Sequence, residues 1–513
     1  MNTPRHRLDK CLIANRGEIA VRVIRTCREL DIQTVAVYSE ADSAARHVRM
    51  ADEACPIGPA AAADSYLRID TLIDVARRTG CDCVHPGYGF LSESPDFAQA
   101  VIDAGLVWVG PPPDAIRVMG VKTEARALMQ QAGVPLVPGY QPTPADQHND
   151  EAFIAAAARI GWPLMVKAAG GGGGKGIRIV RQPEDLPHAL ESARREARNA
   201  FGDPRVYLEK FIEPARHVEV QIIADGHGRV LHLYDRECST QRRHQKIIEE
   251  SPSPLLDDDM RARMCVAAVE AARAVNYVNA GTVEFIATGG GEFYFLEMNT
   301  RLQVEHPVTE MLTGLDLVRL QFAIAAGEPL PLKQAEITRR GHAIECRVYA
   351  EDPHQDFMPA TGIVHTFIPP EGPGVRVDAG LKSGDAVTIH YDPMIAKIIV
   401  QAGTRATAIQ RMRAALQSTV ILGTTTNLEF LLALIDDPAF AAGGVDTGYV
   451  DRHLHDLLPE LPPVPDSALI ALALADFHAA GAPAANGNNR ADRYSPWARA
   501  DGFRLKRRQE SQP

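Results

Sequence analysis

Several features that define common protein classes are scarce in this chain of 513 residues. The net charge is −11, so there is no basic excess to neutralise the phosphates of a nucleic acid. The eight cysteines are scattered, and the closest pair, Cys81 and Cys83, has no second pair at zinc-like spacing. The most apolar run, residues 468–475, is far too short to span a bilayer. These shortages argue against a nucleic-acid-binding protein, a zinc-finger protein and a membrane protein.

The bulk composition indicates an ordinary globular protein. Hydrophobic residues make up 45% of the chain and charged residues 23%. Residues 1–10 are polar and basic with no apolar segment after them, so no secretory signal is visible. Cysteines without a disulfide spacing fit a reducing compartment. We therefore expect a cytoplasmic protein whose partners are neither nucleic acid nor membrane.

The length predicts roughly three domains. At the start, a short apolar strand at residues 11–14, a helix with Ile19 and Val23 at helical spacing, and a strand at 34–38 form a strand–helix–strand unit. The turn between them, residues 15–18, lacks the glycine pattern of a dinucleotide site. The chain therefore begins as an α/β protein of another kind.

Paired carboxylates occur on a predicted hairpin later in the chain. Residues 282–287 and 293–298 have the pattern of strands and are joined by a glycine turn. Folding this hairpin about its centre places Glu284 opposite Glu297, to within one residue. Like charges that face each other across a ladder are destabilising unless a cation lies between them. Carboxylates together with the oxygen of Asn299 are ligands of the kind that Mg²⁺ takes.

The run that continues this hairpin, residues 297–305, alternates polar and apolar side chains. In an extended chain, the odd positions place Glu, Asn, Arg, Gln and Glu on one face. We therefore predict a site for metal-bound phosphate with an arginine and a further carboxylate beside it. A polar, solvated sheet face is the alternative.

Five consecutive glycines, residues 170–174, precede Lys175 and Gly176. A Walker A loop is excluded because Ala169 occupies the first glycine position and Gly176 the Ser/Thr position. Residues 177–180 alternate like a strand, so the run does not open a helix. We interpret it as a flexible loop between two strands that can close over phosphates, and a loose surface loop is the alternative.

Three other segments are candidates for ligand contact. Residues 206–212 form a mostly apolar strand that can present backbone groups and a carboxylate to an adenine and a ribose. Residues 238–246 carry a basic cluster between two apolar strands; this is either a solvated face or a receptor for anions. Tyr88 lies in the glycine-containing loop 85–90, which is either a tight turn or a ligand loop.

Together these motifs resemble those of the biotin carboxylases of the ATP-grasp superfamily. The resemblance rests on the glycine-rich hairpin, Glu-Lys-Phe-Ile at 209–212, the segment 241–246, Glu284 and the run 297–307, and it extends from about residue 8 to 455. Such enzymes use MgATP to activate bicarbonate as carboxyphosphate and then transfer CO₂ to N1 of biotin on a carrier domain.

The resemblance implies a fold that combines α/β and α+β regions. It implies a Rossmann-like N-terminal domain over residues 1–120, an ATP-grasp domain over 121–330 with a mobile glycine-rich lid at about 138–210, a C-terminal biotin carboxylase domain over 335–455, and a linker and truncated tail over 456–513. One departure is Asn279, where relatives commonly have glycine. Asn tolerates a positive φ better than most residues do.

The resemblance also implies roles for the matching side chains. The nucleotide site would contain the phosphate-binding Lys122 and Lys167, the lid residues Gly173 and Gly174, the adenine-site residues Glu209, Lys210, Phe211 and Ile212, and nearby His217, Gln241 and His244. The ligands of two Mg²⁺ or Mn²⁺ ions would be Glu284, Glu297 and Asn299. Bicarbonate and biotin would contact Lys246, Arg301, Gln303, Val304, Arg347 and Tyr88. Glu305 would be the general base, assisted by Lys246 and Arg301, and Arg347 would stabilise the biotin enolate.

Within this family, residues 347–353 and 391–397 look more like the α-subunits that act on methylcrotonyl-, geranyl- or propionyl-CoA than like the acetyl-CoA carboxylase component. The tail 494–505 resembles the segment that follows the carboxylase region in those α-subunits, and a disordered end is the alternative. No Met-Lys-Met biotinylation site occurs. We therefore expect a biotin carboxyl carrier protein and a carboxyltransferase subunit as partners, and a homodimer of this chain.

Several alternatives stay open at this point. The chain is either a shortened α-subunit or the product of a split gene. A non-catalytic nucleotide-binding scaffold of a carboxylase complex and another ATP-grasp carboxylate–amine ligase are the competing functions. The acyl-CoA that is finally carboxylated stays open, because that choice belongs to the transferase.

Overall fold

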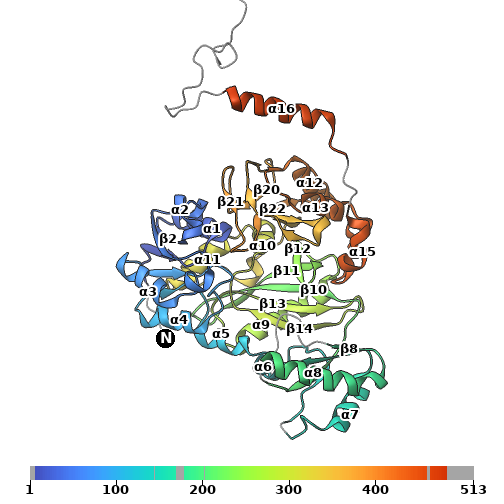
Figure 1. Cartoon of the computed structure of the whole chain (residues 1–513). Helices are drawn as coiled ribbons and strands as arrows, with labels where there is room; N and C mark the ends of the chain where they lie inside the picture. Colours follow the sequence, from blue (N-terminus) through green and yellow to red (C-terminus); the bar gives the residue numbers. More distant parts are fainter. Residues whose placement is uncertain (1–5, 144, 169–177, 202, 459–462, 482–513) are drawn as a thin grey trace, which may run out of the picture. The chain divides into compact units, whose positions relative to one another are not determined.

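The structure is a computed structural model that describes residues 6–143, 145–168, 178–201, 203–458 and 463–481 (Figure 1). The chain divides into two compact units, residues 1–458 and 459–513. The second unit contributes one described helix, α16 (Asp466–Gly481). Among the described residues, no helix is long and apolar enough to cross a membrane.

The N-terminal region is a parallel five-stranded sheet in the order β3-β2-β1-β4-β5. Its strands are β1 (Lys10–Ile13), β2 (Gln33–Ser39), β3 (Glu53–Gly58), β4 (Cys83–His85) and β5 (Val107–Trp108). Helix α1 (Gly17–Glu29) connects β1 to β2, as the strand–helix–strand pattern predicts. The strand order reverses between β1 and β4. Ligands bind parallel sheets at the carboxyl ends of the strands beside such a switch point. Glu18, in the first turn of α1, and Tyr88, in the loop after β4, lie at these ends of the strands.

A small four-stranded sheet, β6-β9-β7-β8, forms the region expected to be a lid. Its strands are β6 (Gly139–Tyr140), β7 (Leu164–Ala168), β8 (Arg178–Val180) and β9 (Val206–Lys210), with helices α7 (Asp150–Ile160) and α8 (Leu186–Phe201). This sheet and its helices have an apolar core of their own, which includes Phe153, Leu190 and Leu208. Strand β9 ends two residues before the predicted Ile212. The glycine run, with Gly173 and Gly174, lies outside the described residues.

The largest element is an antiparallel eight-stranded sheet in the order β14-β13-β10-β11-β12-β15-β22-β20. Its strands are β10 (Arg216–Ala224), β11 (Val230–Arg242), β12 (Gln245–Ser251), β13 (Asn279–Ala287), β14 (Phe293–Asn299), β15 (His342–Tyr349), β20 (Val375–Ala379) and β22 (Met394–Ala402). Helix α9 (Asp258–Ala274) packs on β10, β11 and β13, and helix α10 (His306–Thr313) packs on β11, β12, β15 and β22. The sheet therefore runs without interruption from the segment expected to be the ATP-grasp domain into the segment expected to be the C-terminal domain (Figure 1).

The β13–β14 hairpin confirms the predicted pairing, because Glu284 and Glu297 are direct partners in the register. Asn279, at the start of β13, has a φ of 80°, the backbone conformation for which a glycine or asparagine is suited.

Two expectations about the neighbouring segments are wrong. The run 297–305 is not one extended strand: β14 ends at Asn299, and Glu305 is the N-cap of α10, since Pro307 favours the start of a helix there. The basic segment 238–246 does not lie between two strands. It is the end of β11, a tight turn at Arg243 and His244 with positive φ, and the start of β12.

Candidate active site

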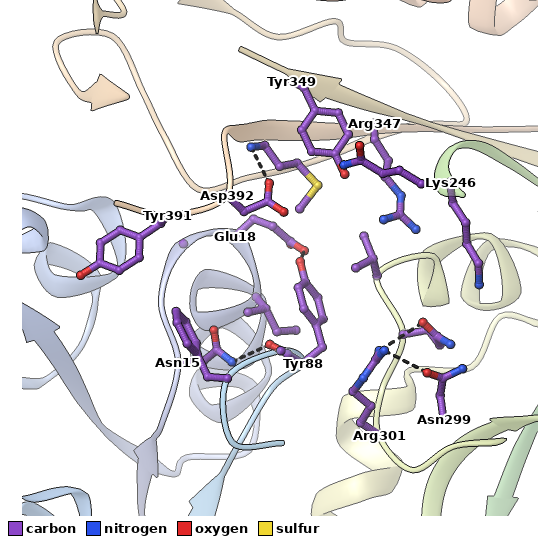
Figure 2. A pocket seen from close by; sticks show the side chains of 18 of the residues that line it. Asn15, Glu18, Tyr88, Lys246, Asn299, Arg301, Arg347, Tyr349, Tyr391 and Asp392 are labelled. Atoms are coloured by element: carbon purple, nitrogen blue, oxygen red, sulfur yellow. Dashed lines mark hydrogen bonds between the residues drawn. The ribbon is translucent and has the colours of Figure 1, made fainter. Parts of the chain in front are cut away.

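A cavity of ≈ 850 Å³ lies where the N-terminal sheet, the eight-stranded sheet and the loop 300–305 meet. It is lined by all six residues predicted to contact bicarbonate and biotin, namely Tyr88, Lys246, Arg301, Gln303, Val304 and Arg347, and by the predicted metal ligand Asn299 (Figure 2). Glu305 is fully buried behind this lining. The structure thus brings together side chains that are up to 259 positions apart in the sequence, counting from Tyr88 to Arg347 (347 − 88).

A second cavity of ≈ 620 Å³ opens between the small sheet and the eight-stranded sheet. The predicted nucleotide residues that line it are Lys122, Lys167, Glu209, Lys210, Phe211 and Ile212. Both cavities share the lining residues His217, Gln241, His244, Leu296, Glu297 and Asn299. The two cavities therefore adjoin at these residues.

Lys246 lines the first cavity and contacts three carboxylates. Its Nζ donates to Glu219 Oε2 at 2.6 Å, to Glu284 Oε1 at 2.8 Å and to Glu305 Oε1 at 2.7 Å. Burial lowers the pKa of Lys246, but these carboxylates outweigh burial and raise that pKa well above its ordinary value. Lys246 is therefore a fixed positive charge.

Sequence reasoning missed Glu219, which is the register partner of Glu284 on the neighbouring strand. A signal was present, since His217, Glu219 and Gln221 alternate with valines along β10.

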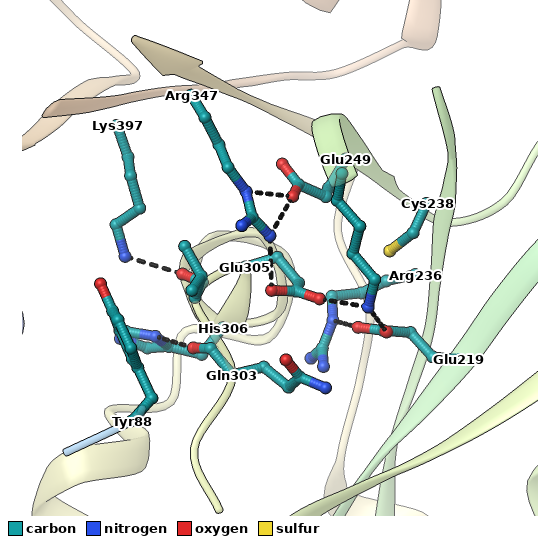
Figure 3. Close-up of polar contacts among 12 residues, drawn as sticks. Tyr88, Glu219, Arg236, Cys238, Glu249, Gln303, Glu305, His306, Arg347 and Lys397 are labelled. Atoms are coloured by element: carbon teal, nitrogen blue, oxygen red, sulfur yellow. Dashed lines mark hydrogen bonds and ion pairs between the residues drawn. The ribbon is translucent and has the colours of Figure 1, made fainter. Parts of the chain in front are cut away.

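Arg347 links the proposed general base to a second buried carboxyl group. It donates from a terminal nitrogen to Glu305 Oε2 at 2.9 Å and from Nε to Glu249 Oε1 at 2.6 Å (Figure 3). Burial opposes ionisation of Glu305, but Lys246, Arg347 and Arg236 outweigh it and hold the pKa of Glu305 well below its usual range. Burial raises the pKa of Glu249 to about 7. In this arrangement Glu305 is a carboxylate that two cations stabilise.

The predicted metal ligands lie side by side, since Glu297 and Asn299 line both cavities and Glu284 lines the first. Burial, and then the charge of Glu284, raise the pKa of Glu297, as expected of two carboxylates paired across a ladder. Asn299 Nδ2 donates to Glu284 Oε1 at 2.8 Å, and His217 Nε2 lies 3.0 Å from Glu284 Oε2. Two carboxylates and an amide oxygen are hard donors, and a divalent ion between Glu284 and Glu297 would remove their repulsion. The donor set therefore fits Mg²⁺, and the ligand assignment stays a prediction.

Arg301 is held by a residue that the sequence gave no reason to choose. Its Nε donates to Glu93 Oε2 at 2.9 Å, and the other oxygen of Glu93 accepts from the backbone N–H of Thr300 at 3.1 Å. Terminal nitrogens of Arg301 also donate to Asn299 Oδ1 at 2.9 Å and to Gln303 Oε1 at 3.1 Å. Glu93 therefore fixes the guanidinium from the N-terminal region.

In the second cavity, Glu209 accepts hydrogen bonds from Lys167 and from Arg126, the latter at 2.6 Å. Lys210 Nζ donates to the carbonyl of Trp162 at 2.7 Å, so it faces the small sheet's own loop. Sequence reasoning missed Arg126 and Thr447, which also line this cavity. Thr447 belongs to the C-terminal segment, so no local pattern connects it with the strand β9.

Three family models match the chain. They are described as biotin carboxylase, N-terminal domain, over residues 7–116; carbamoyl-phosphate synthase L chain, ATP binding domain, over 121–333; and biotin carboxylase C-terminal domain, over 345–452. The biotin carboxylase of Halalkalibacterium halodurans is 51% identical over 445 residues, which cover 87% of this chain and 98% of that protein. The mitochondrial methylcrotonoyl-CoA carboxylase subunit alpha of Rattus norvegicus is 52% identical over 458 residues, 89% of this chain and 64% of the relative.

Solved structures give the same result. The biotin carboxylase domain dimer of Hydrogenobacter thermophilus 2-oxoglutarate carboxylase, in complex with MgADP, ADP and bicarbonate, has a TM-score of 0.82 and 44% identity. The match covers 89% of this chain and 100% of the solved chain. The biotin carboxylase of Campylobacter jejuni in a βγ-ATP complex also has a TM-score of 0.82, with 43% identity over 87% of this chain and 99% of that chain. These matches confirm the mixed α/β and α+β fold expected from the sequence.

Proposed function

The chain belongs to the biotin carboxylase family, and from this premise we propose how its residues divide the work of ATP-dependent carboxylation of biotin. The observation that carries the proposal is the convergence of Lys246 and Arg347 on Glu305, within 2.7 and 2.9 Å of its two oxygens, at the wall of a cavity that continues into a nucleotide-sized one. Two cations that can also bind anionic substrates are thereby placed on the carboxylate that would act as the base.

The first step is the attack of bicarbonate on the γ-phosphorus of ATP. Glu305 accepts the bicarbonate proton while the new O–P bond forms and the bond from the γ-phosphorus to the bridging oxygen of ADP breaks. A base with a strongly lowered pKa is weak. Lys246 and Arg347 therefore have to transfer hydrogen bonds from Glu305 to the substrate anions, which raises its pKa toward the working range. Gln303, Arg301 and the backbone of Val304 surround the bicarbonate.

Carboxyphosphate then gives CO₂ and phosphate, and the phosphate removes the proton from N1 of biotin. Arg347 stabilises the resulting enolate, because its planar fork matches a planar anion better than lysine does. Lys122, Lys167 and the adenine-site residues 209–212 hold the nucleotide. A divalent ion at Glu284, Glu297 and Asn299 supplies charge compensation for the phosphates when it is bound.

The wider assembly is a further part of the proposal. The chain spans 64% of the length of the rat methylcrotonoyl-CoA carboxylase alpha subunit. We infer that it serves an acyl-CoA carboxylase of this kind, with a carrier protein that presents biotin, a carboxyltransferase subunit and a second copy of this chain. Some relatives are named as mitochondrial proteins. The cytoplasmic location expected from the sequence therefore stays a prediction.

The two competing functions make different demands on the site. A scaffold that only binds nucleotide needs no base, yet Glu305 and both of its cations are present. A carboxylate–amine ligase needs an amine site, whereas Arg301 and Arg347 present cations to the first cavity. Both observations favour biotin carboxylation over a scaffold and over a carboxylate–amine ligase.

The test is ADP release by the full chain with MgATP and free biotin, with and without bicarbonate. We expect release that depends on both biotin and bicarbonate. Nucleotide binding without turnover, even with a biotinylated carrier added, would favour the scaffold. Release that depends on an amine instead of bicarbonate would favour the ligase.

A further inference from the structure

The segment Gln303–Val304–Glu305 is held from behind by two fully buried side chains. Lys397 Nζ donates to the carbonyl of Val304 at 2.7 Å, and His306 Nδ1 lies 2.8 Å from the carbonyl oxygen of Gln303 (Figure 3). Lys397 and His306 both have 0% exposure. The carbonyl of Val304 belongs to the peptide that joins it to Glu305, and the carbonyl of Gln303 belongs to the peptide before it. Both peptides that flank Val304 are therefore fixed.

The charge of Lys397 is anchored in the N-terminal region. Its Nζ lies 3.0 Å from Glu18 Oε1, and the hydroxyl of Tyr88 donates to the same carboxylate oxygen. Burial lowers the pKa of Lys397, but Glu18, Glu345 and Asp378 outweigh burial and raise it. Lys397 is therefore charged, and it ties β22, helix α1 and the loop 300–305 together at one point. Figure 2 shows Glu18 and Tyr88 in contact at the cavity wall.

His306 is a neutral partner of this lysine. Burial, and then the positive charges of Lys397, Arg22 and Arg376, hold its pKa well below the ordinary value. Glu310 is the carboxylate that faces the ring, with 3.8 Å between Nε2 and Oε2. A neutral imidazole with its proton on Nδ1 donates to the Gln303 carbonyl. His306 therefore contributes a hydrogen bond without a second charge.

Lys397 also stands next to the arginine that binds Glu305. The register pairs Arg347 on β15 with Lys397 on β22, so the two side chains leave the sheet as neighbours. Arg347 contacts the carboxylate of Glu305, and Lys397 contacts the peptide immediately before it. Two adjacent strands thus hold the side chain and the backbone of one short segment.

We propose that Lys397 is a positioning residue for biotin carboxylation, with His306 as its partner, and that together they orient Gln303, Val304 and Glu305 toward bicarbonate. The inference rests on the proposed function of this site. Neither side chain lines the cavity, so their effect passes through the backbone that they hold. Displacing a reacting group by about 1 Å costs on the order of a hundredfold in rate.

The test compares Lys397→Met with the double variant Lys397→Met/Glu18→Gln, which also neutralises the carboxylate that lies 3.0 Å from Lys397 Nζ. We expect kcat/KM for bicarbonate to fall about a hundredfold. The affinity for MgATP, measured by calorimetry, should change by less than about twofold, because the nucleotide residues lie in the second cavity. His306→Leu removes the other carbonyl contact without stranding a charge, and it tests the same idea where the lysine variants fail to fold.

The matched control is Arg261→Met/Asp235→Asn. Arg261 Nε donates to Asp235 Oδ1 at 2.7 Å, and this buried pair does not touch the segment 303–305. We expect it to lower stability without a selective loss for bicarbonate.

Wild-type kcat/KM in the Lys397 and His306 variants would overturn the inference, and so would an equal loss for bicarbonate and MgATP. An inactive wild-type protein would instead overturn the proposed function, and the inference with it.

Discussion

The two ends of the joined cavity are built in different ways. At the nucleotide end, Lys167 and Glu209 belong to the small sheet, which has a separate apolar core, and Glu209 has Lys167 and Arg126 as its partners. At the anion end, Lys246 contacts three carboxylates and Arg347 two, on the continuous eight-stranded sheet. The anion end is therefore already organised, whereas the nucleotide end depends on the small sheet, a module with its own core. The mobility of that module stays a prediction.

The largest effect should come from removing the base at the organised end. We expect Glu305→Gln to lower bicarbonate-dependent ADP release by about a thousandfold, since general-base catalysis contributes ~10²–10⁴. Nucleotide affinity should be retained. The control is Glu292→Gln, an exposed glutamate in the turn of the β13–β14 hairpin. A variant with full turnover would remove Glu305 from the mechanism.

The next effect concerns the wall that the two ends share. We expect Glu297→Gln to weaken Mn²⁺ binding, measured by electron paramagnetic resonance with nucleotide present, by at least about tenfold, because losing a direct ligand should cost no less than the roughly tenfold to hundredfold lost with a hydrogen-bond partner of a ligand. Chelation of divalent ions should stop turnover of the wild-type protein. Because Gln cannot repel Glu284, the same variant should be at least as stable as the wild type without metal. Unchanged Mn²⁺ affinity would contradict the ligand assignment.

A smaller effect is expected at the nucleotide end. Lys167→Gln removes a charged donor, and a charged hydrogen bond of about 2 kcal/mol corresponds to a roughly thirtyfold increase in the Kd of MgATP. The KM for bicarbonate should not change, which would distinguish the two ends. Lys382→Gln, at an exposed lysine, is the control. Equal losses for both substrates would show that the two ends act as one.

The last effect is on stability and not on activity, and it is a pH dependence that arises from His85 at the end of β4. His85 accepts from the backbone N–H of Gly87 at 3.0 Å and its Nε2 lies 3.2 Å from Gln321 Oε1, so the fold holds a neutral ring. Burial lowers the pKa of His85 to about 4. The unfolded chain takes up this proton near pH 6.5 and the folded chain only near 4, so this contribution to stability is present above pH 6.5 and is lost as pH falls toward 4.

For His85, the free energy of unfolding should fall by about 1.4 kcal/mol per pH unit across that window. Denaturant unfolding of the wild type and of His85→Gln between pH 4.5 and 7.5 measures the difference in slope. His47, whose pKa burial also lowers to about 4, continues to titrate in both proteins. Identical slopes would show that His85 is not held neutral by the fold.

Local patterns were sufficient for some of the site and insufficient for the rest. The hairpin that pairs Glu284 with Glu297 could be predicted because its turn and alternation lie within one short segment. Glu93 and Lys397 could not, because their partners Arg301 and Val304 are far away in the sequence and meet them only through tertiary structure. The prediction that residues 297–305 are extended is wrong, because the start of α10 overrides the alternation of polar and apolar side chains there. The roles of individual site residues stay predictions.

The continuous eight-stranded sheet has a consequence for dividing this protein into parts. The ladder between β12 and β15 joins residues 248–251 to 343–346, and those strands belong to different family-model segments. A cut in the connection between these segments would leave two open strand edges, each with unpaired backbone amides and carbonyls that invite aggregation. A module exchanged between relatives should therefore be cut at the borders of the small sheet, which has its own apolar core. It should not be cut between residues 333 and 345, where one family model ends and the next begins.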